Sequence, residues 1–267
     1  MTDIINFQKI YELLNDELKC KLEIEVLEKA TSTNTLVKEL ATEKKEGFVM
    51  VAGEQTAGRG RMGRSFFSPG DSGVYMSLLL KPQIKPEDAV QITTAAAVSV
   101  CKALEKLGVF DAKIKWVNDI YIGNRKICGI LTESSFNPQS EILNFAVLGV
   151  GINIYESEEG FPDEIKDIAG AVFSEREENL RNKFIAEFIN AFFKFYNVLS
   201  TKKHMKEYKE KSFVLGKEIN IIQSENIRSG KAIDIDENCN LVVELPDGNT
   251  EKLYSGEISV KVKHFQQ

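Results

Sequence analysis

Histidine is scarce in this 267-residue sequence, which contains only His204 and His264, both late in the chain and among lysines. Histidine is the usual general base of a nucleophilic triad and a common ligand of zinc. Triads and histidine-based zinc centres therefore have little material to work with here. We expect both histidine side chains to lie at the solvated surface.

Cysteine is also sparse, and Cys20, Cys101, Cys128 and Cys239 are scattered without close spacing. This arrangement matches neither a disulfide framework nor a paired-cysteine metal site. The first twenty residues lack the uninterrupted apolar segment of a signal peptide, and no apolar run approaches the roughly 20 residues that cross a bilayer. We therefore expect a protein of the reducing cytoplasm that neither spans nor enters a membrane.

The sequence has no excess of positive charge. Its 40 acidic and 34 basic side chains give a formal net charge of −6 at pH 7. Proteins that coat nucleic acid displace counterions through clustered lysine and arginine. The acidic balance argues against that class of protein, so any site for an anion must be local.

Apolar periodicity predicts an α+β fold, with both helices and strands. A short helix is expected from Phe7 to Leu14 and a half-exposed strand from Leu22 to Val26. The polar residues 31–34 precede an apolar helical run, so their side chains are candidates for an N-cap. Further strands are expected at residues 48–52, 74–80, 112–117, 119–122, 126–133 and 144–154, and long helices at residues 89–107 and 179–199.

The composition changes after a lysine cluster at residues 202–211. Helical periodicity gives way there to short strands, with turn signals at residues 237–238 and 247–248. We therefore predict a main domain over residues 1–211 and a small all-β barrel over residues 212–267.

Gly58, Gly60 and Gly63 have the spacing of a dinucleotide-binding fingerprint. In that fingerprint the glycines open a helix whose N-terminus meets the pyrophosphate. Here residues 66–73 (FFSPGDSG) follow, and they cannot continue a helix. The match in spacing is therefore interpreted as accidental.

The same segment carries Arg59, Arg61 and Arg64, whose planar guanidinium groups suit phosphate and carboxylate. Glycines between them permit close approach of the backbone to a ligand. We expect a loop that becomes ordered when a ligand binds. A solvated surface turn and an RNA-contacting segment are the alternatives.

The two-residue turn signal Gly123-Asn124 predicts a β-hairpin. If Ile122 pairs with Arg125, Asp119 and Lys126 become diagonal neighbours about 7–8 Å apart. At that separation they could address two ends of one reacting group without neutralising each other, although a surface hairpin with solvated charges gives the same pattern. In this register Tyr121 faces Lys126, Asp119 faces Cys128, and Asp119, Tyr121, Lys126 and Cys128 share one face.

Gly149 and Gly151 interrupt an apolar strand, which indicates either a bulge or close packing of a ligand. Asn153 follows them, and its amide could contact an adenine edge or form a turn. Trp116, the only tryptophan, is interpreted as a core anchor.

Taken together, five segments resemble motifs of the biotin protein ligases: residues 32–34 (STN), 55–61 (QTAGRGR), 115–119 (KWVND), 125–130 (RKICGI) and 149–153 (GVGIN). The resemblance covers the chain from about Leu22 to its C-terminal end, where residues 255–260 (SGEISV) resemble the family's small C-terminal domain. It implies a mixed-sheet catalytic domain of the biotin and lipoyl ligase type in residues 1–211 and an SH3-like β-barrel in residues 212–267.

The resemblance implies that biotin and ATP are joined as biotinoyl-5′-AMP with release of pyrophosphate. The biotinoyl group then passes to one lysine of a biotin carboxyl carrier protein, that of acetyl-CoA carboxylase or a related enzyme. Mg²⁺ is expected as a cofactor, but its ligands are not identified by the sequence. A lipoate or octanoate ligase of the same fold is the first alternative, and a noncatalytic RNA-binding module is the second.

Residue roles follow from the resemblance. Fixed positive charge must offset the repulsion between a carboxylate and the α-phosphate, and Lys126 would bridge these two groups. Asp119 would orient or deprotonate the incoming lysine amine. The expected catalytic residues are Lys126, Asp119, Arg59 and Arg61. The expected biotin and nucleotide contacts are Ser32, Thr33, Asn34, Gln55, Gly58, Arg59, Gly60, Arg61, Tyr75, Lys115, Asn118, Lys126, Gly129, Gly151, Asn153 and Lys261.

Three positions depart from the family pattern. Val117 replaces a common proline, Phe66 replaces a frequent tryptophan, and Lys261 stands where some members carry arginine. Bifunctional members also carry an N-terminal helix-turn-helix, which needs two helices and a turn. Because the residues before Ser32 are too few for one, we expect a monofunctional ligase without direct DNA binding. The sequence leaves the oligomeric state open, a homodimer included.

Overall fold

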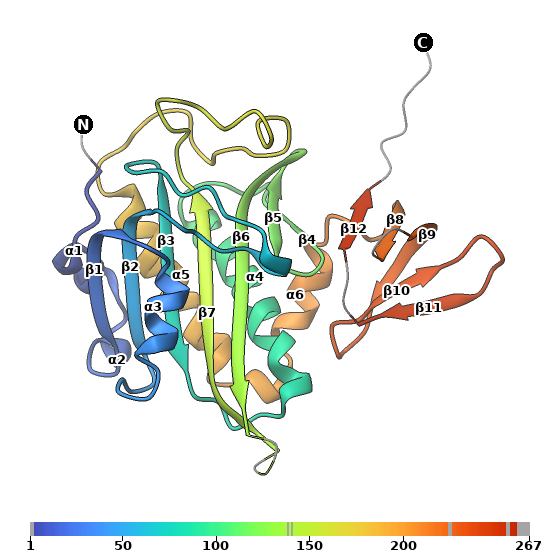
Figure 1. Cartoon of the computed structure of the whole chain (residues 1–267), viewed down its shortest axis with the longest axis horizontal. Helices are drawn as coiled ribbons and strands as arrows, with labels where there is room; N and C mark the ends of the chain where they lie inside the picture. The colour runs from blue at the N-terminus through green and yellow to red at the C-terminus, as the bar shows by residue number, and fades with distance from the viewer. Residues whose placement is uncertain (1–2, 138, 140, 224–225, 255–256, 261–267) are drawn as a thin grey trace.

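The computed structural model describes residues 3–137, 139, 141–223, 226–254 and 257–260, which build two β-sheets (Figure 1). The larger sheet has the strand order β1-β2-β3-β7-β6-β5-β4, and the smaller one has the order β11-β10-β9-β8-β12. Strand β1 runs parallel to β2, whereas the other neighbours in the larger sheet are antiparallel. The mixed sheet and the α+β class are therefore confirmed.

The elements lie close to the predicted ranges. The larger sheet contains β1 (Glu23–Ala30), β2 (Phe48–Gln55), β3 (Gly73–Leu80), β4 (Lys113–Lys115), β5 (Asp119–Ile122), β6 (Arg125–Phe136) and β7 (Leu143–Asn153). The smaller sheet contains β8 (Glu218–Gln223), β9 (Asn226–Ile235), β10 (Leu241–Glu244), β11 (Thr250–Leu253) and β12 (Glu257–Val260). The helices are α1 (Phe7–Leu13), α2 (Asp16–Lys19), α3 (Thr33–Glu39), α4 (Val90–Lys106), α5 (Leu180–Tyr196) and α6 (His204–Glu210), with 3₁₀ turns at Arg61–Gly63, Pro86–Ala89 and Leu199–Thr201.

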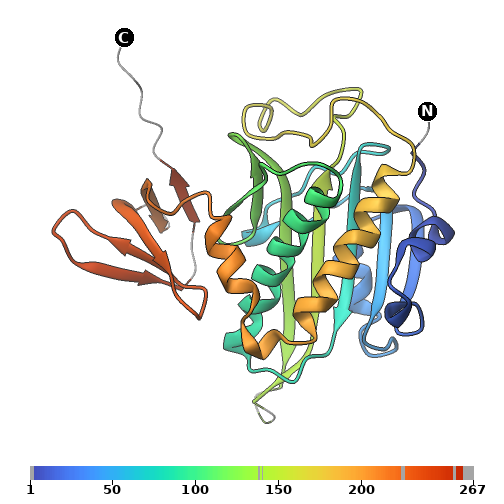
Figure 2. The ribbon, with the colours of Figure 1, turned by 180° about the vertical axis from the view of Figure 1, so that it is seen from behind.

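Helices cover both faces of the larger sheet. Helix α3 lies on one face (Figure 1), and α4 and α5 lie on the other (Figure 2). Along β2, Phe48 and Met50 pack with α3, while Val49 and Val51 belong to the core beneath α4 and α5. A strand covered on both faces reads as a continuous apolar run, which explains the pattern at residues 48–52 and 74–80.

Helix α5 supplies much of the core through its phenylalanines. Phe184, Phe188 and Phe192 are fully buried and stack in sequence, with ring centroids 6.4 and 5.8 Å apart. Their spacing of four residues places them on one face of a helix.

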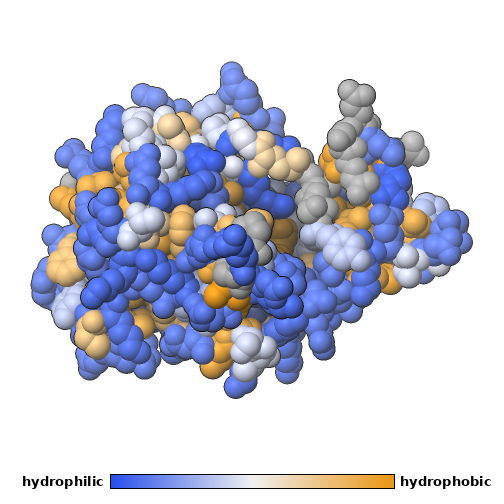
Figure 3. Space-filling model, turned by 60° about the horizontal axis from the view of Figure 1, so that its bottom comes forward, coloured by the Kyte–Doolittle hydropathy of each residue, from blue (hydrophilic) through white to orange (hydrophobic). Residues whose placement is uncertain are grey.

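No helix among the described residues has the length and apolarity needed to cross a membrane. The face of the molecule in Figure 3 is largely hydrophilic, with scattered apolar residues.

The two sheets are joined by backbone and side-chain contacts. The amide of Phe213 donates to the carbonyl of Ile114 on β4 at 2.7 Å. Trp116 is buried, and its indole Nε1 donates to the carbonyl of Cys239, in the turn between β9 and β10, at 2.8 Å. The role of Trp116 as a core anchor is confirmed, with the addition that it holds the C-terminal sheet. The domain boundary at residue 211 stays a prediction.

His204 was expected at the surface and is instead buried, with 1% of its area exposed. Its Nε2 lies 2.9 Å from the hydroxyl oxygen of Thr94 on α4, and burial lowers the pKa of the imidazole to about 4. The lysine-rich neighbourhood misled the prediction, because α6 turns its lysines outward and packs His204 and Met205 inward. His264 and Lys261 lie outside the described residues.

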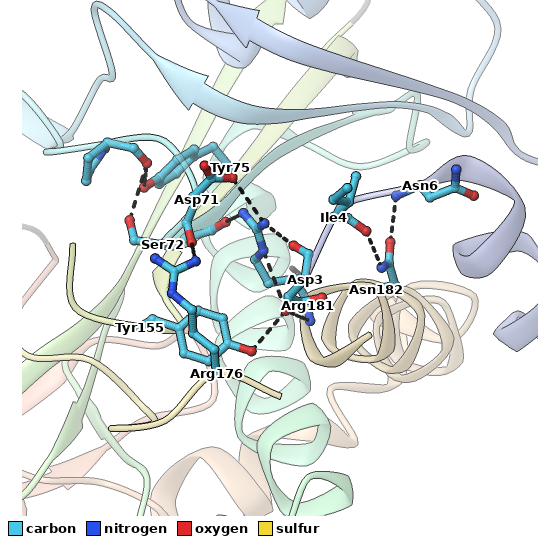
Figure 4. Close-up of polar contacts among 12 residues, drawn as sticks. Asp3, Ile4, Asn6, Asp71, Ser72, Tyr75, Tyr155, Arg176, Arg181 and Asn182 are labelled. Atoms are coloured by element: carbon cyan, nitrogen blue, oxygen red, sulfur yellow. Dashed lines mark hydrogen bonds and ion pairs between the residues drawn. The ribbon is translucent and has the colours of Figure 1, made fainter. Parts of the chain in front are cut away.

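The N-terminal segment is fastened to the start of α5 by a buried ion pair (Figure 4). Asp3 Oδ2 accepts hydrogen bonds from the amide of Arg181 at 2.9 Å and from the hydroxyl of Tyr155 at 2.9 Å. The guanidinium of Arg181 donates to the carbonyls of Asp3 and Gly73, and it lies 3.6 Å from Asp71. Arg181 thereby links the N-terminal segment to the turn that begins β3.

Removal of the Asp3 carboxylate should destabilise the fold strongly. Asp3→Ala leaves the buried charge of Arg181 without its principal partner, and the expected cost is about 3–5 kcal/mol of unfolding free energy. Asp16→Ala is the matched control, because Asp16 pairs with Lys19 at the surface and is 96% exposed. Urea denaturation of both variants measures the difference. Equal denaturation midpoints for the two variants would contradict a stabilising role of the ion pair between Asp3 and Arg181.

The buried imidazole should make stability depend on pH. The pKa of His204 is about 4 in the folded chain, against 6.5 for an ordinary histidine, so protons bind the unfolded state first. Stability should therefore fall as the pH drops from about 6.5 to about 4. His204→Gln should reduce this loss by roughly 3 kcal/mol. Chemical denaturation of both proteins at pH 7 and pH 4.5 makes the comparison, and parallel pH profiles would refute it.

Candidate active site

A cleft opens where the α3 face of the larger sheet meets the glycine-arginine loop, residues 58–64. Thirteen of the sixteen expected contact residues and the catalytic candidate Asp119 line it: Ser32, Thr33, Asn34, Gln55, Arg59, Gly60, Arg61, Tyr75, Lys115, Asn118, Asp119, Lys126, Gly129 and Gly151. Ile258 of β12 also lines the cleft, so the C-terminal sheet contributes to it. Gly58 and Asn153 do not line it.

One end of the cleft is rich in hydroxyl and amide groups. Ser32 is the N-cap residue of α3 but makes no capping hydrogen bond through its side chain. The amide of Thr33 donates instead to Gln55 Oε1 at 2.8 Å, and Gln55 Nε2 donates to the hydroxyl of Ser68 at 3.0 Å. The predicted local cap is thus wrong, because a side chain from β2 satisfies the start of the helix.

Asn34 is buried beneath this end of the cleft, and both the oxygen and the nitrogen of its side-chain amide are hydrogen-bonded. Its Oδ1 lies 2.6 Å from the hydroxyl of Ser77, and its Nδ2 donates to the carbonyl of Leu131 and to Glu133 Oε2. A Cβ on Gly149 would lie 2.1 Å from Asn34 Oδ1. Gly149 is therefore required for close packing, but the group packed against it is the Asn34 side chain, where the sequence had suggested a bulge or a ligand.

The opposite end of the cleft carries a chain of charged and polar groups. Arg61 Nη1 donates to Asn118 Oδ1 at 2.8 Å, and Asn118 Nδ2 donates to Asp119 Oδ1 at 3.0 Å. Lys126 Nζ lies 2.8 Å from the same Asp119 oxygen. The expectation that Asp119 and Lys126 stand apart without neutralising each other is wrong, since they form an ion pair.

The long side chain of Lys126 spans the separation that was predicted between the two residues. The predicted register also differs, because of a β-bulge. The pairs Ile122 with Arg125 and Tyr121 with Lys126 are as predicted, but the register then shifts. Ile127 is the extra residue on β6, so Asp119 lies opposite Gly129 rather than Cys128. Cys128 leaves the predicted shared face and is fully buried, and burial raises the pKa of its thiol well above the ordinary value.

The backbone of Lys126 is fixed from both sides by the segment before α5. Its amide donates to the carbonyl of Ile168 at 2.7 Å, and its carbonyl accepts from the amide of Gly170 at 2.9 Å. Asn153 Nδ2 donates to the carbonyl of Gly170 at 3.0 Å. Asn153 is thus not brought to the cleft, and it holds the segment that fixes Lys126.

An aromatic ring covers the bare backbone in the middle of the cleft. A Cβ on Gly151 would lie 2.7 Å from the ring of Phe66, and a Cβ on Gly129 would lie 3.1 Å from it. Tyr75 contacts Phe66 edge to face, with centroids 6.4 Å apart, and donates its hydroxyl to the carbonyl of Pro69. Burial raises the pKa of Tyr75, which makes this phenol a hydrogen-bond donor rather than a base.

The glycine-arginine loop folds back on itself instead of opening a helix. The amide of Gly60 donates to the carbonyl of Arg64 at 2.7 Å, and the amide of Phe66 donates to the carbonyl of Gly58 at 2.9 Å. Only a single 3₁₀ turn, Arg61–Gly63, lies between. The rejection of the dinucleotide fingerprint is confirmed, whereas ordering of the loop by a ligand stays a prediction.

Sequence reasoning missed several residues that build the cleft. Ser77 could have been found, because it is the one serine in the apolar run of β3. Glu133, Ser68 and Ile258 carry no local signal. Among the described residues, no group of three or more histidine, cysteine, aspartate or glutamate side chains could hold a metal ion.

Comparisons with known proteins agree with the geometry. Residues 26–153 match the model of the biotin/lipoate A/B protein ligase family, and residues 214–261 match the biotin protein ligase C-terminal domain. The bifunctional ligase/repressor BirA of Bacillus subtilis is 33% identical over 243 residues, covering 86% of this chain and 71% of the relative. A biotin--[acetyl-CoA-carboxylase] ligase of Mycobacterium tuberculosis is 25% identical, covering 88% of each chain.

A solved structure gives the same picture. The biotin protein ligase from Aquifex aeolicus in complex with biotin and ATP superimposes with a TM-score of 0.73 and 26% identity, covering 90% of this chain and 98% of that one.

The space above Gly149, which we call the notch, is filled by Asn34 and should not tolerate a side chain at Gly149. Gly149→Ala places a methyl group against Asn34 and should cost about 1–3 kcal/mol of stability. Adding Asn34→Ala makes room for that methyl group, so the double variant should be less destabilised than the sum of the single variants. Thermal unfolding of the four proteins completes the cycle, and strict additivity would contradict the packing described.

Proposed function

The chain belongs to the biotin protein ligases, and we propose that it activates biotin as biotinoyl-5′-AMP and transfers the biotinoyl group to a lysine of a carrier domain. One observation carries this proposal: a single cleft joins an end rich in hydroxyl and amide groups, at Thr33 and Gln55, to an end with the cations Arg61 and Lys126. A small acid with a polar head and a carboxylate tail matches such a cleft.

The two ends serve different parts of the substrate. Hydroxyl and amide groups at the Thr33 end pair with the ureido ring of biotin, and glycine backbone at Gly129 and Gly151 leaves room for the apolar chain. The carboxylate then reaches the charged end. Ser32 and Asn34 support the polar end, and Lys115, Asn118 and Arg61 surround the reacting groups.

Fixed positive charge makes the first reaction feasible. A carboxylate oxygen of biotin attacks the α-phosphorus of ATP, and the bond from that phosphorus to pyrophosphate breaks. Both reactants are anionic, so the ammonium of Lys126 and the guanidinium of Arg61 lower the barrier as charge gathers on the phosphate oxygens. Asn118 holds Arg61 in place through its Oδ1.

The ion pair of Lys126 with Asp119 prepares the second reaction. When phosphate and carboxylate oxygens attract Lys126, Asp119 keeps the amide of Asn118 and becomes free to accept from another donor. The acceptor lysine amine is that donor. The amine attacks the acyl carbon, AMP leaves, and the proton lost by the amine passes toward Asp119.

The residues present fit Mg²⁺ that travels with ATP. Asp119 is the only carboxylate among the described residues that line the cleft. Mg²⁺ is usually held by one or two carboxylates together with substrate phosphates and water. Mg²⁺ neutralises phosphate charge when bound.

The finer proposals concern partner and location. The carrier of acetyl-CoA carboxylase is the proposed acceptor, supported by the name of the mycobacterial relative. Four free cysteines, three of them buried, support a cytoplasmic location. The proposal is confined to the ligase reaction and does not extend to DNA binding.

Lys126→Ala should reduce biotin-dependent pyrophosphate release by about 10²–10³-fold, because one fixed charge at the transition state is lost. Stability should change little, since the side chain is 31% exposed and its ion pair with Asp119 is only partly buried. Lys29→Ala, which breaks a surface pair with Glu54, is the control. Full activity of the Lys126 variant would remove that residue from the mechanism.

The function itself is tested by the mass of a carrier domain after incubation with the wild-type protein, Mg-ATP and biotin. A biotinoyl mass increase is expected. No increase with biotin, together with modification when lipoate is supplied, would overturn the proposal in favour of a lipoate ligase of the same fold.

A further inference from the structure

Glu133 joins two parts of the cleft that are far apart in the sequence. Its Oε2 accepts from Arg59 Nη1 at 3.1 Å and from Asn34 Nδ2 at 3.2 Å. Its Oε1 lies 3.6 Å from Lys38 Nζ on α3. The Glu133 carboxylate is largely buried, with 17% of its side chain exposed, whereas the Arg59 side chain is 45% exposed, so solvent screens the contact in part.

Arg59 and Arg61 consequently differ in what they contact. Arg61 reaches Asn118 at the charged end of the cleft. Arg59 reaches Glu133, whose charge offsets its own. An arginine paired in this way is poorly placed to stabilise phosphate, but it is well placed to hold a loop.

The anchor that Glu133 provides is rigid. It stands on β6, and the second partner of its Oε2, Asn34, is wedged into the notch at Gly149 and bonded to Ser77. Arg59 lies in the first half of the glycine-arginine loop, between two glycines that give little conformational restraint. The backbone hydrogen bonds of the loop set its internal shape, and the contact with Glu133 fixes its first half against β6.

We propose that Glu133 is a positioning residue, which anchors the glycine-arginine loop through Arg59 to the biotin end of the cleft and so sets the affinity for biotin. This inference rests on the proposed ligase function and changes the role of Arg59 from a phosphate-binding cation to the anchored end of the loop. Arg61 and Lys126 retain their proposed role of stabilising charge at the reacting carboxylate and phosphate.

The proposal separates binding from chemistry. Without the anchor the loop must be ordered by biotin itself, which lowers apparent affinity by the fraction of loops in the competent position. Once biotin is bound, Arg61 and Lys126 are in place. Glu133→Gln should therefore raise KM for biotin about tenfold, as for loss of a charge-assisted hydrogen bond. The value of kcat for pyrophosphate release should change less than KM.

Arg59→Gln should give the same change as Glu133→Gln, and the double variant should be no worse than either single variant. Lys38→Gln is the matched control, because it removes another cation from Glu133 without touching the loop. It should leave KM for biotin unchanged. Independent, multiplying effects of the Arg59 and Glu133 changes, or a rise in KM for ATP in Arg59→Gln alone, would overturn the proposal.

Hydrogen exchange on the full-length protein without ligand tests the anchor apart from the reaction. The amides from Gly58 to Arg64 should exchange faster in Glu133→Gln and Arg59→Gln than in the wild type or Lys38→Gln. Equal exchange in all four proteins would refute the anchor. Failure of the wild type to release pyrophosphate with biotin would refute the proposed function, and the exchange result would still decide whether Glu133 holds the loop.

Discussion

The cleft depends on one constraint, the absence of side chains at two positions of β7. Gly149 admits the amide of Asn34 and Gly151 admits the ring of Phe66, each closer to the sheet than any Cβ would allow. These two insertions hold α3 and the segment directly after the glycine-arginine loop against the same strand. The polar end and the charged end of the cleft therefore both rest on β7, and their separation is set by the rise per residue of a β-strand.

The sequence indicated the fold well where local pattern decides structure. The run at residues 48–52, the phenylalanine helix and the Gly123-Asn124 turn all lie where periodicity and turn chemistry place them. The hairpin register failed after two pairs, because a bulge inserts Ile127 and the alternation rule assumes none. Two adjacent apolar residues, Ile127 and Cys128, were the only trace of it.

Contacts between distant residues could not be predicted in the same way. Gln55 caps α3 in place of Ser32, and Asn153 holds Gly170 rather than entering the cleft. His204 is buried because the opposite face of its helix carries the lysines. In each case a residue's type was visible, but its partner lies far along the chain, and only packing selects among the candidates. The family motifs identified the cleft residues because members of one fold bring the same motif positions together, whatever their separation in the sequence.

The segment that follows β7 is held by backbone hydrogen bonds near both of its ends, and this affects where the chain can accept insertions. Residues 172 and 173 bond to the backbone of Asn153 and Ile154, and residues 168 and 170 bond to Lys126. The connection from residue 156 to residue 167 thus begins and ends at fixed points. Because the entropy of closing a loop grows slowly with its length, insertions there would leave the lysine where it is. This stretch is a natural place to graft a reporter or to alter contacts with a partner without redesigning the chemistry.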